Sequence, residues 1–439
     1  MPQHFTTPQI AALDNTPVDN PITNAGAELG RVLFYDARLS HNNGVACASC
    51  HTQETGFSDP NQFSTGVNGV TGRQSPGLSN AKFYVNRESG TGHFFWDERA
   101  NTLEDQVLGP IQDPVEMGST LSSLVDELNA TDYYPTLFNR AFGAGGVTSD
   151  RMSKALAQFV RAMASYQSPF DAAIAAGTQQ APNFAAVDAI DDPVQVSQGH
   201  TLFNDDCASC HRTAAQVSDN THNIGLPNID ADGDGQLDDN TGTGGGASSN
   251  PDAGSGEYKS PSLRNIAMRG HFMHDGRFST LEEVVEFYSS GITPNGHPLS
   301  RGARNGGFGY TEAEKAALVA FMETLTDTTF LTSELFSNPL VTLAGDYDGS
   351  GVVDDEDLAS WQAEYGMTDA DVDGPLYADG NGDGRVDSTD YTLWRDNYGA
   401  TWDTSGIAAL AQAVPEPAGL GIVTAALALL RRPRRPRSS

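Results

Sequence analysis

The chain of 439 residues contains few basic residues, few cysteines and no long hydrophobic run. Only 25 residues are Lys or Arg, against 57 Asp or Glu, and the formal net charge is −32. This balance excludes a general affinity for nucleic acid, because binding phosphates needs a basic face. The four cysteines all lie in two short motifs, so none is left over for a disulfide. Cysteine usage by itself therefore does not report an oxidising compartment.

The start of the chain also lacks the segments that direct export. Residues 1–20 contain neither a basic n-region nor an apolar h-region, so they are not a signal peptide. At the other end, the apolar run at 418–430 is thirteen residues long, short of the roughly 20 that a membrane span needs. It follows Val414-Pro-Glu-Pro417 and precedes an arginine-rich cluster of the kind that stops transfer.

Residues 414–437 resemble a PEP-CTERM sorting tail, a signal that bacterial exosortases are thought to process. The alternative is a fortuitous hydrophobic tail. The resemblance implies export to the periplasm or the cell surface, with a leader missing from this sequence. It also implies that the chain meets a membrane only through this tail.

The two cysteine motifs are copies of one pentapeptide, C-x-x-C-H. They are Cys47-Ala-Ser-Cys50-His51 and Cys207-Ala-Ser-Cys210-His211. In c-type cytochromes the two thiols of this motif attach to the porphyrin, and the histidine binds the iron. A zinc site built from the four cysteines would leave both histidines unexplained. The sequence therefore predicts two covalently attached haem c groups, which bacteria add after export.

Helix-start signals and long loops predict a mainly α fold. Ser279-x-x-Glu282 and Thr311-x-x-Glu314 are capping boxes that begin two helices. No run of alternating strands is present, which fits a pair of cytochrome c-type domains, one for each haem. The predicted haem domains span residues 25–185 and 194–335.

A third region, residues 341–403, contains two acidic loops 33 residues apart. In each loop, side-chain oxygens stand at positions 1, 3, 5, 9 and 12. A backbone carbonyl at position 7 completes a set suited to Ca²⁺. The predicted ligands are Asp346, Asp348, Ser350, Val352, Asp354 and Asp357 in the first loop, and Asp379, Asn381, Asp383, Arg385, Asp387 and Asp390 in the second.

With Asp at position 12 and a short amphipathic segment after each loop, this region resembles a type I dockerin. The resemblance implies a small α module with a cohesin-like docking partner. The alternative is an acidic spacer without a bound ion. A single weaker loop of the same kind, from Asp230 to Asp238, is a further candidate for calcium.

Several motifs around the cysteine pentapeptides occur in a recognisable order. They are Leu33-Phe-Tyr-Asp36-x-Arg38-Leu-Ser40, Gly72-Arg73-x-Ser75-Pro76, Phe95-Trp96-Asp97-x-Arg99-Ala100, Leu108-Gly-Pro110-Ile-Gln-x-Pro-x-Glu116-Met117, Leu263-Arg264-Asn265-Ile266 and His274-Asp-Gly276. Together they resemble the bacterial di-haem cytochrome c peroxidase family, which includes the tryptophylquinone-forming enzyme of methylamine dehydrogenase maturation. The resemblance covers roughly residues 26–335.

This resemblance implies an enzyme that reduces hydrogen peroxide to water at the haem of His51. Electrons would come from a small redox protein, a cytochrome c or a cupredoxin, through the haem of His211 and then Trp96. The family's distal-pocket pattern falls on Gln106, Pro110 and Glu116, with Glu116 as general acid/base.

Two departures from the family pattern concern the iron ligands. Typical members carry a histidine in the loop at 63–73 that closes the first haem, and this chain has none there. The first iron is therefore expected to be open. At the position of the axial methionine of typical members the chain has Tyr288, as the quinone-forming branch does. A core tyrosine is the alternative for Tyr288, and Met268 and Met273 are rival ligands.

The family also holds a calcium ion between the haems. The implied ligands are Gln74, in place of the usual asparagine, and backbone carbonyls near Arg269 and His271.

Two other functions fit parts of the sequence. One is peroxide-dependent oxidation of a partner protein's side chains, as the tyrosine at 288 suggests. The other is a di-haem electron carrier without enzymatic activity, docked by its calcium module. An open distal pocket with Glu116 argues against the carrier, because a carrier gains nothing from an unligated iron.

Overall fold

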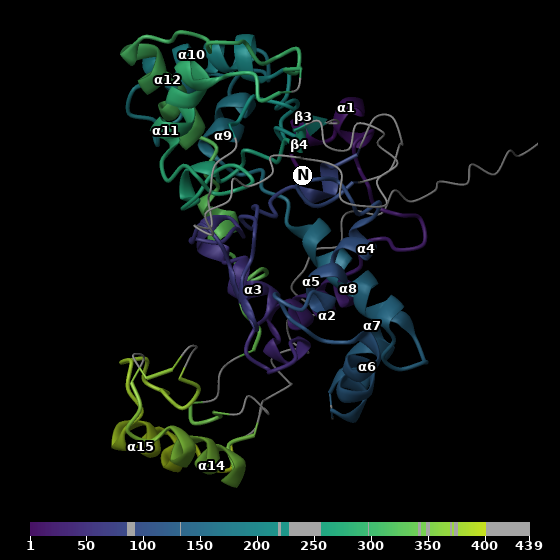
Figure 1. Ribbon diagram of the computed structural model, residues 1–439. Helices are drawn as coiled ribbons and strands as arrows, with labels where there is room; N and C mark the ends of the chain where they lie inside the picture. The colour runs from purple at the N-terminus through teal and green to yellow at the C-terminus, as the bar shows by residue number, and fades with distance from the viewer. Residues whose placement is uncertain are drawn as a thin grey trace, which may run out of the picture.

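The computed structural model is mainly α-helical, which confirms the predicted fold class (Figure 1). Its strands form two antiparallel pairs of two residues each. Within the described parts of the chain, none of the helices has the length and apolar character that a membrane crossing requires. The structure describes residues 1–85, 93–131, 133–217, 221–227, 256–296, 298–340, 344–347, 352–368, 371–372 and 376–400.

Three sequence predictions fall outside these described residues. They are the candidate calcium loop from Asp230 to Asp238, the ligands Asp348 and Ser350 of the first dockerin-like loop, and the tail at 414–437.

The first haem-binding region is built from short helices whose starts are capped by threonine. Its elements are α2 (Asn24–Tyr35), α3 (Cys47–Cys50), β1 (Thr65–Gly66), β2 (Gly69–Val70), α4 (Leu103–Gln106), α5 (Gly109–Gln112), α6 (Leu121–Ala130), α7 (Tyr134–Phe142) and α8 (Ser149–Ala162), preceded by α1 (Pro8–Ala11). The side chains of Thr23, Thr102, Thr120 and Thr148 each accept a backbone N–H in the first turn of the helix that follows.

The second haem-binding region repeats this plan with fewer helices. Its elements are α9 (Pro169–Ala175), α10 (Pro193–Leu202), β3 (Thr221–His222), β4 (Tyr258–Lys259), α11 (Leu281–Glu286), α12 (Glu312–Glu323) and α13 (Thr328–Leu331). The predicted capping box of Thr311 and Glu314 is confirmed. The box predicted at Ser279 and Glu282 is wrong by one residue, because Thr280 and Glu283 form it instead.

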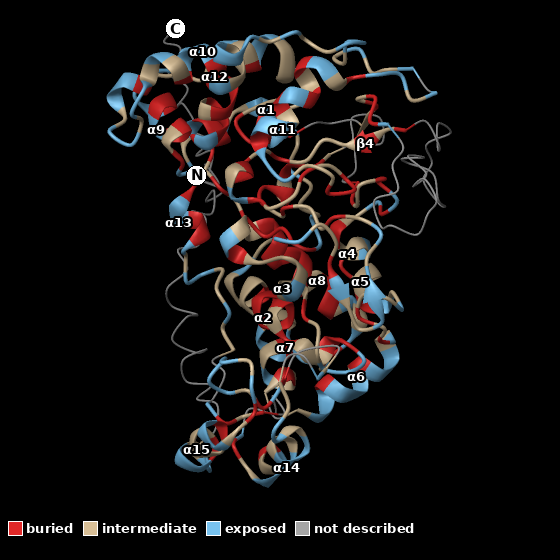
Figure 2. Ribbon diagram, turned by 60° about the vertical axis from the view of Figure 1, so that its left-hand side comes forward, coloured by how far each residue is buried: buried red, intermediate tan, exposed pale blue. Residues whose placement is uncertain are grey.

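In each region a glycine lets the first and last long helices cross closely. A Cβ on Gly30 of α2 would lie 2.0 Å from the Ala155 carbonyl oxygen of α8, and one on Gly199 of α10 would lie 1.9 Å from that of Ala317 in α12. Figure 2 shows buried residues gathered along both helix pairs. The shared crossing shows that the two regions are copies of one architecture.

The duplication extends to the loops that line the haem pockets. Ser75-Pro-Gly-Leu-Ser-Asn80 and Ser260-Pro-Ser-Leu-Arg-Asn265 correspond, and both asparagines adopt the left-handed conformation, with φ of 63° and 60°. Further along, isolated bridges join Phe94 to Ala100 and Phe272 to Phe278. By this correspondence His274 occupies in the second region the place that Trp96 has in the first.

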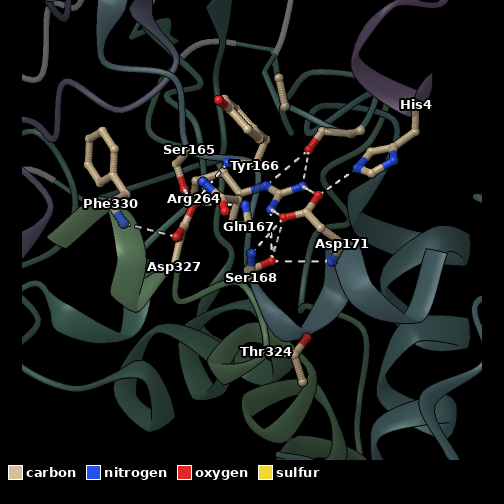
Figure 3. Close-up of polar contacts among 12 residues, drawn as sticks. His4, Ser165, Tyr166, Gln167, Ser168, Asp171, Arg264, Thr324, Asp327 and Phe330 are labelled. Carbon is tan, nitrogen blue, oxygen red and sulfur yellow. Dashed lines mark hydrogen bonds and ion pairs between the residues drawn. The ribbon is translucent and has the colours of Figure 1, made fainter. Parts of the chain in front are cut away.

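The junction between the regions is held by buried ion pairs and hydrogen bonds (Figure 3). The Arg264 guanidinium contacts both carboxylate oxygens of Asp171, at 2.5 and 2.9 Å, and His4 Nε2 lies 2.7 Å from Asp171 Oδ1. Although burial opposes it, these partners hold the pKa of Asp171 well below its usual range. Nearby, Asp327 Oδ2 accepts the backbone N–H groups of Tyr166 and Gln167. The connecting segment is thus fixed to the second region.

A separate small module carries α14 (Asp355–Glu364) and α15 (Ser388–Asn397). Figure 1 shows it apart from the haem-binding regions, beyond the end of the first. Its two halves are tied reciprocally, since Trp361 Nε1 donates to the Asp387 carbonyl at 2.8 Å and Trp394 Nε1 to that of Asp354 at 2.7 Å. The predicted internal repeat therefore folds as a symmetric pair.

We expect Gly199→Ala to destabilise the protein by about 1–3 kcal/mol, because the added methyl would push α10 away from the Ala317 carbonyl. Urea unfolding of the haem-loaded protein measures the change. Gln198→Ala, on the exposed face of the same helix, is the control and should unfold like wild type. Equal stability of Gly199→Ala and wild type would contradict the close crossing.

Candidate functional site: two haem cavities and the wall between them

The first cavity is lined by His51, which directly follows the helical turn of Cys47 and Cys50. Nδ1 of His51 lies 2.8 Å from the carbonyl oxygen of Phe57, a contact of the kind that orients a metal-binding imidazole. Burial lowers the pKa of His51, so the ring is kept neutral, the form that binds metal. Two thiols beside a buried neutral histidine fit a covalently attached haem.

The predicted distal residues line this same cavity. Gln106 ends α4, Pro110 lies in α5, and Glu116 follows in the next turn. The hairpin of β1 and β2 holds this turn, because Val67 donates its N–H to the Glu116 carbonyl at 2.9 Å. Burial first, and then the charge of Asp113, raise the pKa of Glu116. A carboxyl group tuned upward can both give and take a proton near neutral pH.

No second histidine reaches the first cavity within the described residues. The part of the 63–73 loop that lines it contributes Val70, Thr71, Gly72 and Arg73. The face of the cavity that carries Glu116 is therefore built without an imidazole that could bind iron.

The second cavity is lined by Cys207, Cys210 and His211. Burial lowers the pKa of His211 to about 4, which again favours the neutral, metal-binding ring. Nδ1 of His274 also lines this cavity, buried and without a hydrogen-bond partner. A buried polar atom of this kind needs a polar partner, and a haem with its carboxylates supplies polar atoms. This donor set also fits a haem.

Of the three candidate axial ligands for the second haem, two line its cavity. Tyr288 and Met273 do so, whereas Met268 is 42 % exposed and does not. Tyr288 follows His274 by 14 residues, the same distance that separates Pro110 from Trp96. The two equivalent positions therefore differ. Pro110, which cannot bind iron, lines the first cavity, and the phenol of Tyr288 lines the second.

A shared wall separates the cavities, and sequence reasoning identified only part of it. Trp96, Gln74 and Lys259 line both cavities. Trp96 donates its indole N–H to the Gln74 carbonyl at 2.7 Å, and its ring meets that of His274 edge to face, 6.5 Å between centroids. His274 in turn stacks on Tyr258 at 3.8 Å. An alignment of the two halves of the sequence would have identified His274 as part of this wall, because it occupies the position equivalent to Trp96.

The residues predicted for an inter-haem calcium, Gln74, Arg269 and His271, all line the second cavity. Gln74 is buried, and its amide donates to the Asp59 carbonyl at 3.2 Å. The described residues contain no group of three or more His, Cys, Asp or Glu side chains arranged for a metal.

In the dockerin-like module the position-12 carboxylates are fully buried. Asp357 accepts the N–H groups of Tyr347 and Asp354, and Asp390 accepts those of Asn381 and Asp387. The remaining described positions of the two loops are Asp346, Val352, Asp379, Asp383 and Arg385, of which Asp379 accepts the N–H groups of Gly382 and Gly384. In the described parts of both loops, the backbone therefore turns around the carboxylate at position 12.

Comparison with known proteins agrees with this arrangement. Residues 24–180 match the di-haem cytochrome c peroxidase family, residues 196–326 the cytochrome c family and residues 344–395 the type I dockerin domain. The methylamine utilization protein MauG of Methylophilus methylotrophus is 32% identical over 314 residues, which cover 70% of this chain and 84% of that protein. The chain belongs to the di-haem cytochrome c peroxidase family.

Further relatives are a peroxidase, a MauG-like protein and a di-haem peroxidase. The cytochrome c551 peroxidase of Nitrosomonas europaea is 31% identical, over 68% of this chain and 79% of its own. The crystal structure of a MauG-like protein associated with microbial copper homeostasis shares 30% identity, with a TM-score of 0.61 over 77% of this chain and 98% of that one. The di-haem peroxidase BthA of Burkholderia thailandensis, at 23% identity and a TM-score of 0.56, shares the fold.

We expect the dockerin-like module to need Ca²⁺ for its helices, because each loop brings several carboxylates together and they repel one another without the ion. Chelation of the segment 341–403 should lower its helical circular dichroism, and Ca²⁺ should restore it. The double variant Asp357→Asn and Asp390→Asn should respond much less. An unchanged wild-type spectrum on chelation would instead indicate an acidic spacer.

Proposed function

We propose that this chain is a peroxidase that reduces hydrogen peroxide to water at the cavity of His51, using electrons that an external donor delivers through the second haem. The observation that carries the proposal is the presence of Glu116, Gln106 and Pro110 in the same cavity as His51. Membership of the family, with peroxidases among the relatives, supports it.

The haem iron, when bound, supplies the metal centre at which the O–O bond is broken. The chain supplies the proton transfer. Glu116 would take a proton from one peroxide oxygen and pass it to the other, which would leave as water. The remaining oxygen would leave as a second water after uptake of two electrons from the donor and two protons from solvent. The raised pKa of Glu116 suits both halves of its proton transfer. The Gln106 amide is placed in the same cavity to hydrogen-bond the peroxide, and Pro110 keeps the position free of an iron-binding side chain.

Trp96 is the bridge for electrons in this proposal, because it lines both cavities. Its edge-to-face contact with His274, and the stacking of His274 on Tyr258, extend the bridge into the second cavity. The donor we propose is a small redox protein, a cytochrome c or a cupredoxin.

We expect Glu116→Gln to keep both haems but to lower peroxide turnover by about 10²-fold, the usual scale for losing a positioned acid/base group. Steady-state assay with a reduced donor measures it. Glu127→Gln, an exposed change in the same region, is the control. Turnover of Glu116→Gln near that of the control would show that Glu116 takes no part in the reaction.

A second candidate function is peroxide-dependent oxidation of side chains on a partner protein. The observation in its favour is Tyr288, which lines the second cavity beside His211. Burial raises the pKa of Tyr288, so a phenolate there needs an adjacent cation such as ferric iron. A phenolate ligand stabilises ferric iron and lowers its reduction potential. Such a haem suits the storage of oxidising equivalents better than the uptake of electrons from a high-potential donor.

We expect Tyr288→Phe to change the optical spectrum of the second haem and to raise its reduction potential, if the phenolate is the ligand. Tyr310→Phe is the matched control, because Tyr310 lines the same cavity but hydrogen-bonds Asp206. A spectrum and potential equal to those of the control would make Tyr288 a core residue. Met273 would then be the better ligand, and the ordinary peroxidase the stronger candidate.

The remaining regions complete the proposal. We assign the haem domains to residues 25–185 and 194–335, the dockerin-like module to 341–403 and a PEP-CTERM-like tail to 414–437. The match to type I dockerins supports calcium in that module and a cohesin-like partner that docks the enzyme. Export to the periplasm or the cell surface is the location that haem attachment and the tail favour.

A further inference from the structure

Arg269 is a buried cation at the boundary between the two cavities. It lines the second cavity, and its side chain lies against Gly77, which lines the first. A Cβ on Gly77 would come within 2.7 Å of Arg269 Nη2 and 2.9 Å of Nε, so no other residue type fits there without displacing the guanidinium. Nη2 donates to the Ser262 carbonyl at 2.8 Å, which fixes the orientation of the group.

The charge of Arg269 has no counter-charge among the described residues. Arg269 is 8 % exposed, makes no ion pair with a described carboxylate, and its Nε is buried without a hydrogen-bond partner. Two other buried arginines differ. Arg264 contacts both oxygens of Asp171, and Arg161 contacts both oxygens of Glu104. A buried guanidinium with neither a charge partner nor a full set of acceptors is costly, so the described residues leave Arg269 able to take an anion.

The neighbouring Lys259 does not share this deficit. Its ammonium donates to the His93 carbonyl and lies 3.8 Å from a carboxylate oxygen of Glu98. It also lies over the ring of Tyr84, 4.2 Å from the centroid. The place for an anion therefore belongs to Arg269. Arg269 lines the second cavity and is not among the residues that line the first, so we expect the anion to approach it from the second cavity.

We propose that Arg269 binds a carboxylate of the haem attached at Cys207 and Cys210, and that its charge raises the reduction potential of that haem. A haem carries two propionate groups, and an arginine fork matches a carboxylate in shape and charge. A fixed positive charge favours the ferrous state, which carries one positive charge fewer than the ferric state. The proposal rests on haem attachment in the second cavity and holds whether the enzyme reduces peroxide or oxidises a partner.

Its consequence is a balance of opposing effects at the second haem. A phenolate from Tyr288 would lower the potential, and Arg269 would offset part of that shift from the other side of the cavity. The haem would then remain reducible by a protein donor even with an anionic ligand.

The test is spectroelectrochemical titration of the full haem-loaded chain. Arg269→Gln should lower the equilibrium constant for reducing the second haem by about tenfold, which is about 59 mV for one electron. Arg269→Lys keeps the charge and should retain most of the potential. Arg304→Gln removes a charge from the same region, but at a side chain that is 62 % exposed, and should change the constant less than twofold. The first haem should move less than the second in every variant.

A potential in Arg269→Gln equal to that of Arg304→Gln would overturn the proposal. If Arg269→Gln fails to retain both haems, Arg269→Lys decides the question by resonance Raman spectroscopy. Lysine cannot reproduce the fork, so the propionate bending band of the second haem should shift relative to wild type. An unchanged band would show that the carboxylate is not bound at Arg269. If the peroxidase proposal itself is wrong, the wild-type protein will show no peroxide turnover, and these reduction potentials will be unaffected.

Discussion

The arrangement of both haem cavities depends on one reciprocal pair of backbone hydrogen bonds. Gln74 donates its N–H to the His274 carbonyl, and Lys259 donates its N–H to that of Trp96, both at 2.9 Å. Because corresponding strands of the two halves pair with each other, the wall is built equally by both domains. A shift of one domain against the other would break this pairing and separate the Trp96 and His274 rings. The buried Arg264–Asp171 pair, which also contacts His4, ties the connecting segment to the second domain.

One duplicated backbone therefore carries two different chemistries. Pro110 and Tyr288 occupy equivalent positions, as do Trp96 and His274. Tyr84 and Arg269 are a further pair, and each reaches across the boundary: the Tyr84 hydroxyl accepts the Ser262 N–H at 2.9 Å, and Arg269 lies against Gly77, the counterpart of Ser262. In each pair the residue of the first domain is neutral, whereas the residues of the second domain are a phenol, an imidazole and a cation. Side chains alone thus distinguish the two cavities: the first carries a carboxyl group whose pKa is raised, and the second carries a phenol, an imidazole and a guanidinium.

The sequence predicted what is local and missed what is formed across the domains. Each pentapeptide, helix start and acidic loop is recognised from a few neighbouring residues. The helix start predicted at Ser279 was one residue early, because Thr280 and Glu283 form the same capping pattern. Glu116 was found only through an ordered family motif, since one glutamate among many carries no signal of its own. The pairing of Gln74 with His274 joins residues 200 positions apart. No periodicity reports such a contact, although alignment of the two halves would have indicated His274.

Because basic residues are scarce in this chain, it matters how the charge of those in the interior is balanced. With 25 Lys and Arg against 57 acidic residues, the chain nevertheless buries Arg31, Arg161, Arg264 and Arg269, and the Lys259 side chain is only 10 % exposed. Arg161 and Arg264 are matched by internal carboxylates and stabilise the fold without a cofactor. Burial lowers the pKa of Arg269 to about 10, and no described carboxylate pairs with it. Among the described residues, the buried charge at the domain junction is therefore paired and the one at the second cavity is not, which fits our proposal that a haem carboxylate completes the second site.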